Sequence, residues 1–241
     1  VNASQLDGAT ALHWAAQRGD VRSTELLIGA KADVNAATDI RITPLWIAST
    51  NGNAAIANRL LEAGADPNIS ALTGVTPLMR AARGGHLAVV QALIDHGANP
   101  NAKELSNDQT ALMWAVSQRH PAVVKVLLQA HADVRANARS WREVVQLCCW
   151  LQTSDDSDIT EVDRGGFTAL HFAARQGDVE SIRLLRGAGA DIDVTAADGS
   201  TPLAIAAFSD QPGALTALLA SGANPNAIGG GYSPLHAAVL R

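Results

Sequence analysis

Histidine has the widest chemistry of any side chain in this sequence, because it can bind a metal or move a proton near neutral pH. The seven histidines are His13, His86, His96, His120, His131, His171 and His236. No two of them have the H-E-x-x-H spacing of a zinc-binding helix. The sequence also has no G-x-S-x-G stretch, and nothing in it brings a serine, a histidine and an aspartate together as a catalytic triad. The histidines therefore predict neither a metal site nor a catalytic centre.

Three further groups of residues have types that occur in metal or phosphate sites. Cys148 and Cys149 are adjacent, and no C-x-x-C pair accompanies them as a zinc site would require. The acidic residues of 155–158 lack the glycine and the terminal glutamate of a calcium loop. The glycines of 229–231 lack the Lys-Ser/Thr of a phosphate-binding loop. We therefore expect no cofactor, no metal and no enzymatic activity.

Three of the histidines stand at the same place in a repeated phrase. The phrase is TALHWAA from Thr10, TPLWIAS from Thr43, TPLMRAA from Thr76, TALMWAV from Thr110, TALHFAA from Thr168, TPLAIAA from Thr201 and SPLHAAV from Ser233. Counted from these positions, successive starts differ by 33, 33, 34, 58, 33 and 32 residues. A period near 33 is typical of proteins built from stacked modules. The phrase therefore indicates a structural role for the histidines within it.

Each repeated unit carries the signals of two helices. A threonine before proline or alanine can cap the start of a helix, and proline suits the first helical position, as at Pro44, Pro77, Pro202 and Pro234. A glycine break follows, and a second helix is predicted by spaced aliphatic residues such as Val89, Val90 and Leu93. A phrase such as GADPN closes the unit, with glycine where the backbone turns left-handed. Lys31 and His131 replace that glycine in two units, at a cost of about 1 kcal/mol each.

A T-P-L-H-x-A-A phrase at this period, closed by G-A-D-x-N, resembles the ankyrin repeat. The resemblance covers essentially the whole chain, because the two phrases stay in phase through six units. It implies an all-α fold, an ankyrin-repeat solenoid of helix-turn-helix pairs with β-hairpin fingers, with six repeats and a truncated seventh in a single array over residues 1–241. In this pattern the imidazole bonds the threonine hydroxyl and neighbouring backbone, so His13, His171 and His236 are expected to be structural.

Composition excludes several classes of protein. The net charge is −5 and no basic tract is present, which disfavours nucleic-acid binding. No apolar run reaches the roughly 18 residues of a membrane span. Two adjacent cysteines cannot form a disulfide framework, so cytoplasmic and exported locations (periplasmic or extracellular) both stay open. Bacterial ankyrin proteins with one enlarged finger before a GGFTxLxFAARQGD phrase look similar, which implies a bacterial source.

Both ends of the sequence resemble partial repeats. Residues 1–9 look like the finger of an earlier repeat, and the chain stops at Arg241, inside the first helix of the seventh unit. Terminal faces of repeat arrays need polar caps. We therefore expect either a segment of a longer protein or self-association through the uncapped ends.

Binding is expected where the repeats differ, because the shared residues build the stack. By resemblance, the position four after the threonine faces the concave groove, and the position three further on lies beside it. The candidate partner-binding residues at these two positions are Trp14, Ile47, Arg80, Arg83, Trp114, Phe172, Arg175, Ile205 and Phe208. Aromatic residues and arginine are typical of binding hot spots. The alternative is that the aromatic rings only pack between neighbouring first helices.

One interval between repeats is 58 residues, which is 25 longer than 33, and it contains an enlarged finger over residues 136–166. An apolar stripe through Trp141, Val144 or Val145, Cys148 and Leu151 suits a helix, whereas the Trp, Val and Cys content suits a long hairpin. Long ordered loops are often functional, so Trp141 and Trp150 join the candidate binding residues. The alternative is a finger that folds back over its neighbours.

These patterns together predict a non-catalytic scaffold that binds another protein through its groove and fingers. The alternative function is a regulatory or targeting segment of a larger protein, which could be an enzyme.

Overall fold

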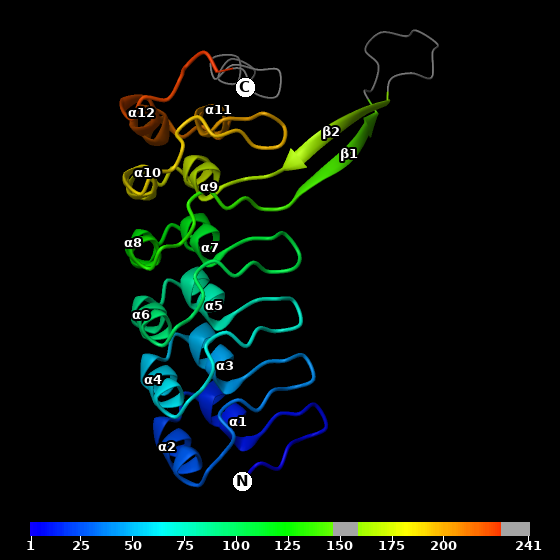
Figure 1. Cartoon of the computed structure of the whole chain (residues 1–241), viewed down its shortest axis with the longest axis vertical. Coiled ribbons are helices and arrows are strands. Elements are labelled where there is room, and N and C mark those ends of the chain that lie inside the picture. The colour runs from blue at the N-terminus through cyan, green and yellow to red at the C-terminus, as the bar shows by residue number, and fades with distance from the viewer. Residues whose placement is uncertain (147–158, 228–241) are drawn as a thin grey trace. The chain divides into compact units, whose positions relative to one another are not determined.

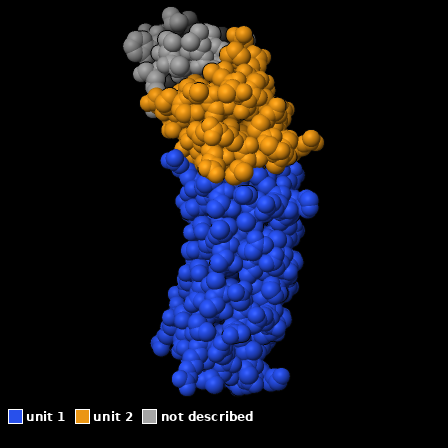
Figure 2. All heavy atoms as spheres, turned by 90° about the vertical axis from the view of Figure 1, so that its left-hand side faces the viewer, with its two compact units in different colours: residues 1–134 blue, residues 135–241 orange. Residues whose placement is uncertain are grey.

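The computed structural model describes residues 1–146 and 159–227 and divides into two compact units, residues 1–134 and residues 135–241 (Figures 1 and 2). The seventh repeat expected near residue 233 lies outside the described residues. The single continuous array over residues 1–241 stays a prediction. Each unit has its own core, built from pairs of antiparallel helices.

Unit 1, residues 1–134, contains four helix pairs. The first helix of each pair, called an inner helix, is α1 (Ala11–Arg18), α3 (Pro44–Asn51), α5 (Pro77–Gly84) or α7 (Ala111–Ser117). The second, called an outer helix, is α2 (Val21–Gly29), α4 (Ala54–Glu62), α6 (Leu87–Asp95) or α8 (Pro121–Gln129). Inner helices pack on inner helices and outer on outer, in chain order, and loops called fingers extend from the inner side (Figure 1).

The described part of unit 2 has two further helix pairs and the two strands of the enlarged finger. Its inner helices are α9 (Ala169–Gln176) and α11 (Pro202–Phe208), and its outer helices are α10 (Val179–Gly187) and α12 (Pro212–Ala220). The finger forms two antiparallel strands, β1 (Ser140–Gln146) and β2 (Ile159–Gly165), with Arg142 opposite Asp163 (Figure 1). The helix alternative for this segment is therefore wrong over residues 140–146. Cys148 and Leu151 lie outside the described residues.

Ion pairs between the two strands stabilise the hairpin. Arg142 lies 2.9 Å from Glu161 and 3.2 Å from Asp163, and Arg164 lies 3.1 Å from Glu143. These groups are solvent-exposed, so each pair contributes at most about 1 kcal/mol. Cross-strand pairs of opposite charge also fix the register of an isolated two-stranded sheet.

The shared residues of the repeat form the core. One leucine of each inner helix, at the same place in the phrase, is at most 1% exposed, and burial of such a side chain stabilises a fold by roughly 1.5–3 kcal/mol. These leucines are Leu12, Leu45, Leu78, Leu112, Leu170 and Leu203. The alanines beside them let inner helices approach closely. The hydrophobic repeat therefore explains why the stack forms.

Histidine replaces the usual threonine cap in two repeats. In most repeats the hydroxyl accepts the backbone N–H three residues on, as Thr43 does from Trp46 at 3.1 Å. In α9 the Nδ1 atom of His171 instead accepts the N–H of Thr168 at 3.1 Å and lies 2.9 Å from its hydroxyl oxygen, while Nε2 reaches the carbonyl oxygen of Ser200 at 3.1 Å. Nδ1 is therefore unprotonated, Nε2 carries the proton, and the ring is neutral.

His13 repeats this geometry, with its Nε2 atom 2.9 Å from the carbonyl oxygen of Ile42. Burial lowers the pKa of His13 and lowers that of His171 to about 4. The expected structural role of these two histidines is confirmed, and His236 lies outside the described residues. Trp46 occupies the same place in its repeat and donates its Nε1–H to the carbonyl oxygen of Val75 at 3.1 Å.

Asparagines link each repeat of unit 1 to the next. The Oδ1 atom of Asn68 accepts the N–H of Asn99 at 2.8 Å, and its Nδ2 atom donates to the carbonyl oxygen of Gly97 at 3.1 Å. Asn35 and Asn101 make the same pair of bonds to the repeats that follow them. The last letter of the G-A-D-x-N phrase thus ties neighbouring repeats together.

Several non-glycine residues adopt left-handed backbone. Lys31 has a φ of 65° and His131 a φ of 61°, so both keep the conformation that glycine has in the other repeats. Arg41, at a finger tip, also has a left-handed backbone, with a φ of 62°. Each of these residues costs about 1 kcal/mol relative to glycine.

Candidate binding surface

The inner helices of unit 1 place the expected groove residues in one row. Trp14, Ile47, Arg80 and Trp114 stand at the same position of α1, α3, α5 and α7, and each of these helices packs on the next. Trp14 is 46% exposed, whereas the other three side chains are half-buried. The side chains that differ between repeats therefore reach the surface, while the shared ones stay in the core.

Arg80 lies flat against a tryptophan of the preceding repeat. Its guanidinium carbon is 4.9 Å from the centre of the Trp46 ring, a cation–π contact, and its Nε–H donates to the hydroxyl of Thr50 at 3.1 Å. Thr50 in turn donates to the carbonyl oxygen of Trp46 at 3.0 Å. Sequence reasoning missed Trp46 because it occupies the place that histidine fills elsewhere.

Arg83 makes a similar contact with the next repeat. Its guanidinium carbon lies 5.4 Å from the centre of the Trp114 ring. The Nε1–H of Trp114 donates to the side-chain oxygen of Gln109 at 2.8 Å. Arg83 is exposed and Arg80 is half-buried, so one arginine of α5 lies over a tryptophan of each neighbouring inner helix. We call Trp46, Arg80, Arg83 and Trp114 the arginine–tryptophan cluster.

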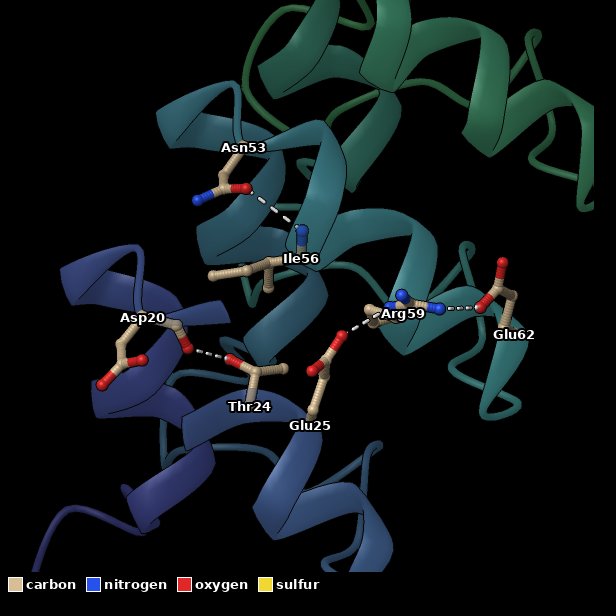
Figure 3. A network of polar contacts seen from close by, with 7 residues as sticks. All are labelled: Asp20, Thr24, Glu25, Asn53, Ile56, Arg59 and Glu62. Carbon is tan, nitrogen blue, oxygen red and sulfur yellow. Dashed lines mark hydrogen bonds and ion pairs between the residues drawn. The ribbon is translucent and has the colours of Figure 1, made fainter. Parts of the chain in front are cut away.

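The cluster is positively charged. Partial burial, and next the charge of Arg83, lower the pKa of Arg80, but arginine stays protonated in proteins. By contrast, Arg59 on the outer helix α4 lies 2.9 Å from Glu25 and 3.3 Å from Glu62 (Figure 3). Within the described part of the chain, neither arginine of the cluster has such an acidic partner.

The described inner helices of unit 2, like those of unit 1, carry one exposed aromatic residue. The expected residues there are Phe172, Arg175, Ile205 and Phe208. The ring of Phe172 packs edge-on against Phe167, which precedes α9, with centroids 6.0 Å apart, and is half-buried. Phe208 is 68% exposed, Arg175 is exposed and Ile205 is half-buried.

The enlarged finger exposes one of its two expected tryptophans. Trp141 on β1 is 54% exposed and lies against Gly165 on β2, where a Cβ atom would be 2.7 Å from the indole ring. Trp150 lies outside the described residues. The hairpin therefore carries an aromatic side chain at its base.

Finger tips of unit 1 expose aliphatic side chains that are not among the candidate binding residues. Ile40 is 60% exposed, Leu72 57% and Leu105 61%. The N–H of Leu72 donates to the carbonyl oxygen of Ile40 at 3.1 Å, and that of Leu105 to Thr73 at 2.9 Å, so successive tips are linked. The sequence does contain a signal for these exposed groups, because aliphatic residues stand at turn positions that usually hold Gly, Asn, Asp, Ser or Pro.

Two searches of the described residues gave negative results. Residues 1–146 and 159–227 contain no group of three or more His, Cys, Asp or Glu side chains arranged to hold a metal ion. In the same ranges, no helix has the length and apolarity to cross a membrane.

Comparison with known proteins identifies the family. The family model for ankyrin repeats (3 copies) matches residues 1–71, 45–138 and 140–228. The B-cell lymphoma 3 protein homolog of Mus musculus is 35% identical over 144 residues, which are 54% of this chain and 32% of that protein. The tyrosine-protein kinase HTK16 of Hydra vulgaris is 30% identical over 139 residues, 55% of this chain and 15% of that protein.

A solved structure shares the fold. The ankyrin repeat domain of human ASB11 superposes with a TM-score of 0.76 at 25% identity, covering 95% of this chain and 92% of that one. The chain spans less than a third of the length of both curated relatives. Both relatives are animal proteins, so they give no support to the expected bacterial source. From the phrases, the helix pairs and these matches together, the chain belongs to the ankyrin repeat family.

Proposed function

We propose that this chain is a non-catalytic scaffold that holds another protein on its inner helices and fingers. The observation that carries this proposal is the division of roles within each repeat. Residues shared between repeats are buried or bonded to the backbone, whereas those that vary expose tryptophan, arginine and aliphatic groups. Such groups are the ones that contribute most to protein–protein affinity.

The experiment is affinity capture from the native organism with the full chain as bait. The Trp114→Ala/Phe172→Ala double variant should lose the captured partner while keeping the helical content of the unchanged chain. Truncating a hot-spot aromatic costs about 2 kcal/mol or more, which is roughly thirtyfold in affinity. Loss of helical content instead would place the two rings in the stack, and unchanged capture would remove them from the binding surface.

The hairpin of β1 and β2 is proposed as a second contact with the partner. It differs from every other finger in length, and its Trp141 side chain is exposed. Deletion of residues 138–162 should weaken binding of the captured partner. Unchanged affinity after the deletion would reject this role and favour a finger that only covers its neighbours.

A second candidate is a regulatory or targeting segment of a longer protein. It is favoured by the small share of each curated relative that the chain spans, since one of those relatives is named a tyrosine-protein kinase. The sequence of the complete gene tests this, because a catalytic domain encoded beside the repeats is required. Light scattering across concentrations tests self-association through the chain ends.

A further inference from the structure

Acidic residues are absent from the inner helices of unit 1. The inner helices α1, α3, α5 and α7 contain the basic residues Arg18, Arg80 and Arg83 and no Asp or Glu. The outer helices α2, α4, α6 and α8 carry both signs in equal number, three acidic residues (Glu25, Glu62 and Asp95) and three basic ones (Arg22, Arg59 and Lys125). The whole chain has 23 acidic and 18 basic residues, so this basic row runs against its composition. Complementary potentials direct a surface toward partners of opposite charge.

The arginine–tryptophan cluster has hydrogen-bond donors to offer. Arg80 uses its Nε–H on Thr50, and among the described residues its two terminal nitrogens have no acceptor. The guanidinium of Arg83 likewise has neither a hydrogen bond nor an ion pair to any described residue, although the carbonyl oxygen of Arg83 lies 3.1 Å from the Nε2 atom of His120. The two residues are three apart on α5, which places their Cβ atoms about 5–6 Å from each other. Because Arg80 lies over Trp46 of α3 and Arg83 over Trp114 of α7, their donors can bind two neighbouring carboxylates of one bound segment.

The tryptophan rings hold the two arginines in place. The indole N–H of Trp46 is bonded to Val75 and that of Trp114 to Gln109, so both rings are fixed before any partner arrives. A guanidinium stacked on a fixed ring loses less conformational entropy on binding than a free side chain does. The cluster is thus organised in advance for a planar anionic group.

We propose that the arginine–tryptophan cluster binds an acidic peptide segment of the partner protein, whose Asp or Glu carboxylates pair with Arg80 and Arg83. This inference rests on the scaffold function proposed above and adds the chemistry of the bound segment. A peptide fits better than a nucleic acid, because phosphate backbones are bound through many basic contacts and this chain has a net charge of −5. A bound carboxylate would also give Arg80 and Arg83 an acidic partner of the kind that Arg59 has on the outer helices.

The test is selection of random 12-residue peptides, displayed on phage, against the immobilised full chain. Selected peptides should be enriched in Asp and Glu, and labelled synthetic copies should bind less tightly as salt rises. Arg80→Gln/Arg83→Gln should weaken their binding about tenfold or more, the loss expected for one hydrogen bond to a charged group. Arg22→Gln/Lys125→Gln removes the same charge from exposed positions of α2 and α8 and should leave affinity unchanged.

Several results would overturn the inference. They are selected peptides without acidic enrichment, equal loss in both double variants, failure to select any peptide, or a 12-nucleotide single-stranded DNA that binds with the same arginine dependence. Arg83→Gln alone, at an exposed position, replaces the double variant if that variant loses helical content. None of these results touches the scaffold proposal, which is tested separately by affinity capture with the full chain.

Discussion

Acidification should destabilise unit 2 through one buried histidine. Burial lowers the pKa of His171 to about 4, since the charged imidazolium would lose its hydration, and the bond to Ser200 only partly compensates. In the unfolded chain the same ring binds its proton near pH 6.5. Between these two values the unfolded state holds more protons than the folded state, so stability falls as the pH drops through this window.

The size of the effect follows from the two pKa values. At pH 5 the unfolded ring is almost fully protonated, whereas the folded ring, with its pKa of about 4, is about one-tenth protonated. The free energy of unfolding should therefore fall by about 2 kcal/mol between pH 7 and pH 5. Burial also lowers the pKa of His13, which adds a loss of the same sign in unit 1.

The assay is urea unfolding at both pH values, followed by circular dichroism, for the unchanged chain and for His171→Met. Methionine is the matched substitution, because Met79 and Met113 fill the same place in two other repeats and are buried there. In the variant, the fall in the free energy of unfolding between pH 7 and pH 5 should be about 2 kcal/mol smaller. An NMR titration that gives His171 a pKa near 6.5, or an equal pH dependence of the free energy of unfolding in both proteins, would refute the reasoning.

Three further predictions concern stability, each checked by urea unfolding at pH 7. Lys31→Gly should raise the free energy of unfolding by up to about 1 kcal/mol, because glycine adopts the observed φ of 65° without strain, and no gain would contradict this. Gly64→Ala places its new Cβ in open space, with no atom within 4 Å, and should lower the free energy of unfolding by about 1 kcal/mol through backbone strain alone. Gly52→Ala should lower it by about 1 kcal/mol more, because its Cβ meets the ring of His86. Equal losses in the two variants would contradict the steric argument. Leu45→Ala, at a side chain that is 0% exposed, should cost about 2–5 kcal/mol, and a cost below about 1 kcal/mol would place this leucine outside the core.

The fold was predictable because its signals are local and repeated. The threonine caps, the buried leucines and the closing glycines each act within one helix or turn, so a single sequence carries them. The enlarged finger was ambiguous for the same reason. The spacing of Trp141 and Val144 fits one face of a helix, whereas tryptophan and valine as residue types favour strands. The cross-strand partners that settle the matter, such as Arg164 opposite Trp141, lie more than 20 residues away.

The arginine–tryptophan cluster was only half predictable. Arg80, Arg83 and Trp114 stand at variable positions and were expected on the surface. Trp46 stands at the histidine place of the repeated phrase and is not among the candidate binding residues. Its indole N–H makes the inter-repeat bond that histidine makes elsewhere, and its ring then lies under Arg80, but neither contact can be read from the sequence. The exposed Ile40 and Leu72 were missed because turn signals describe backbone shape and say little about which side chain points outward.

The bridging asparagines bear on how such a chain evolves. Asn35, Asn68 and Asn101 each bond a backbone N–H and a carbonyl of the repeat that follows, and every repeat offers these two groups whatever its side chains. An in-frame duplication or loss of one segment between two threonines therefore leaves each amide with equivalent partners. Unequal recombination can change the length of the chain by whole modules without disturbing the ties between them, and new copies are then free to acquire other surface residues.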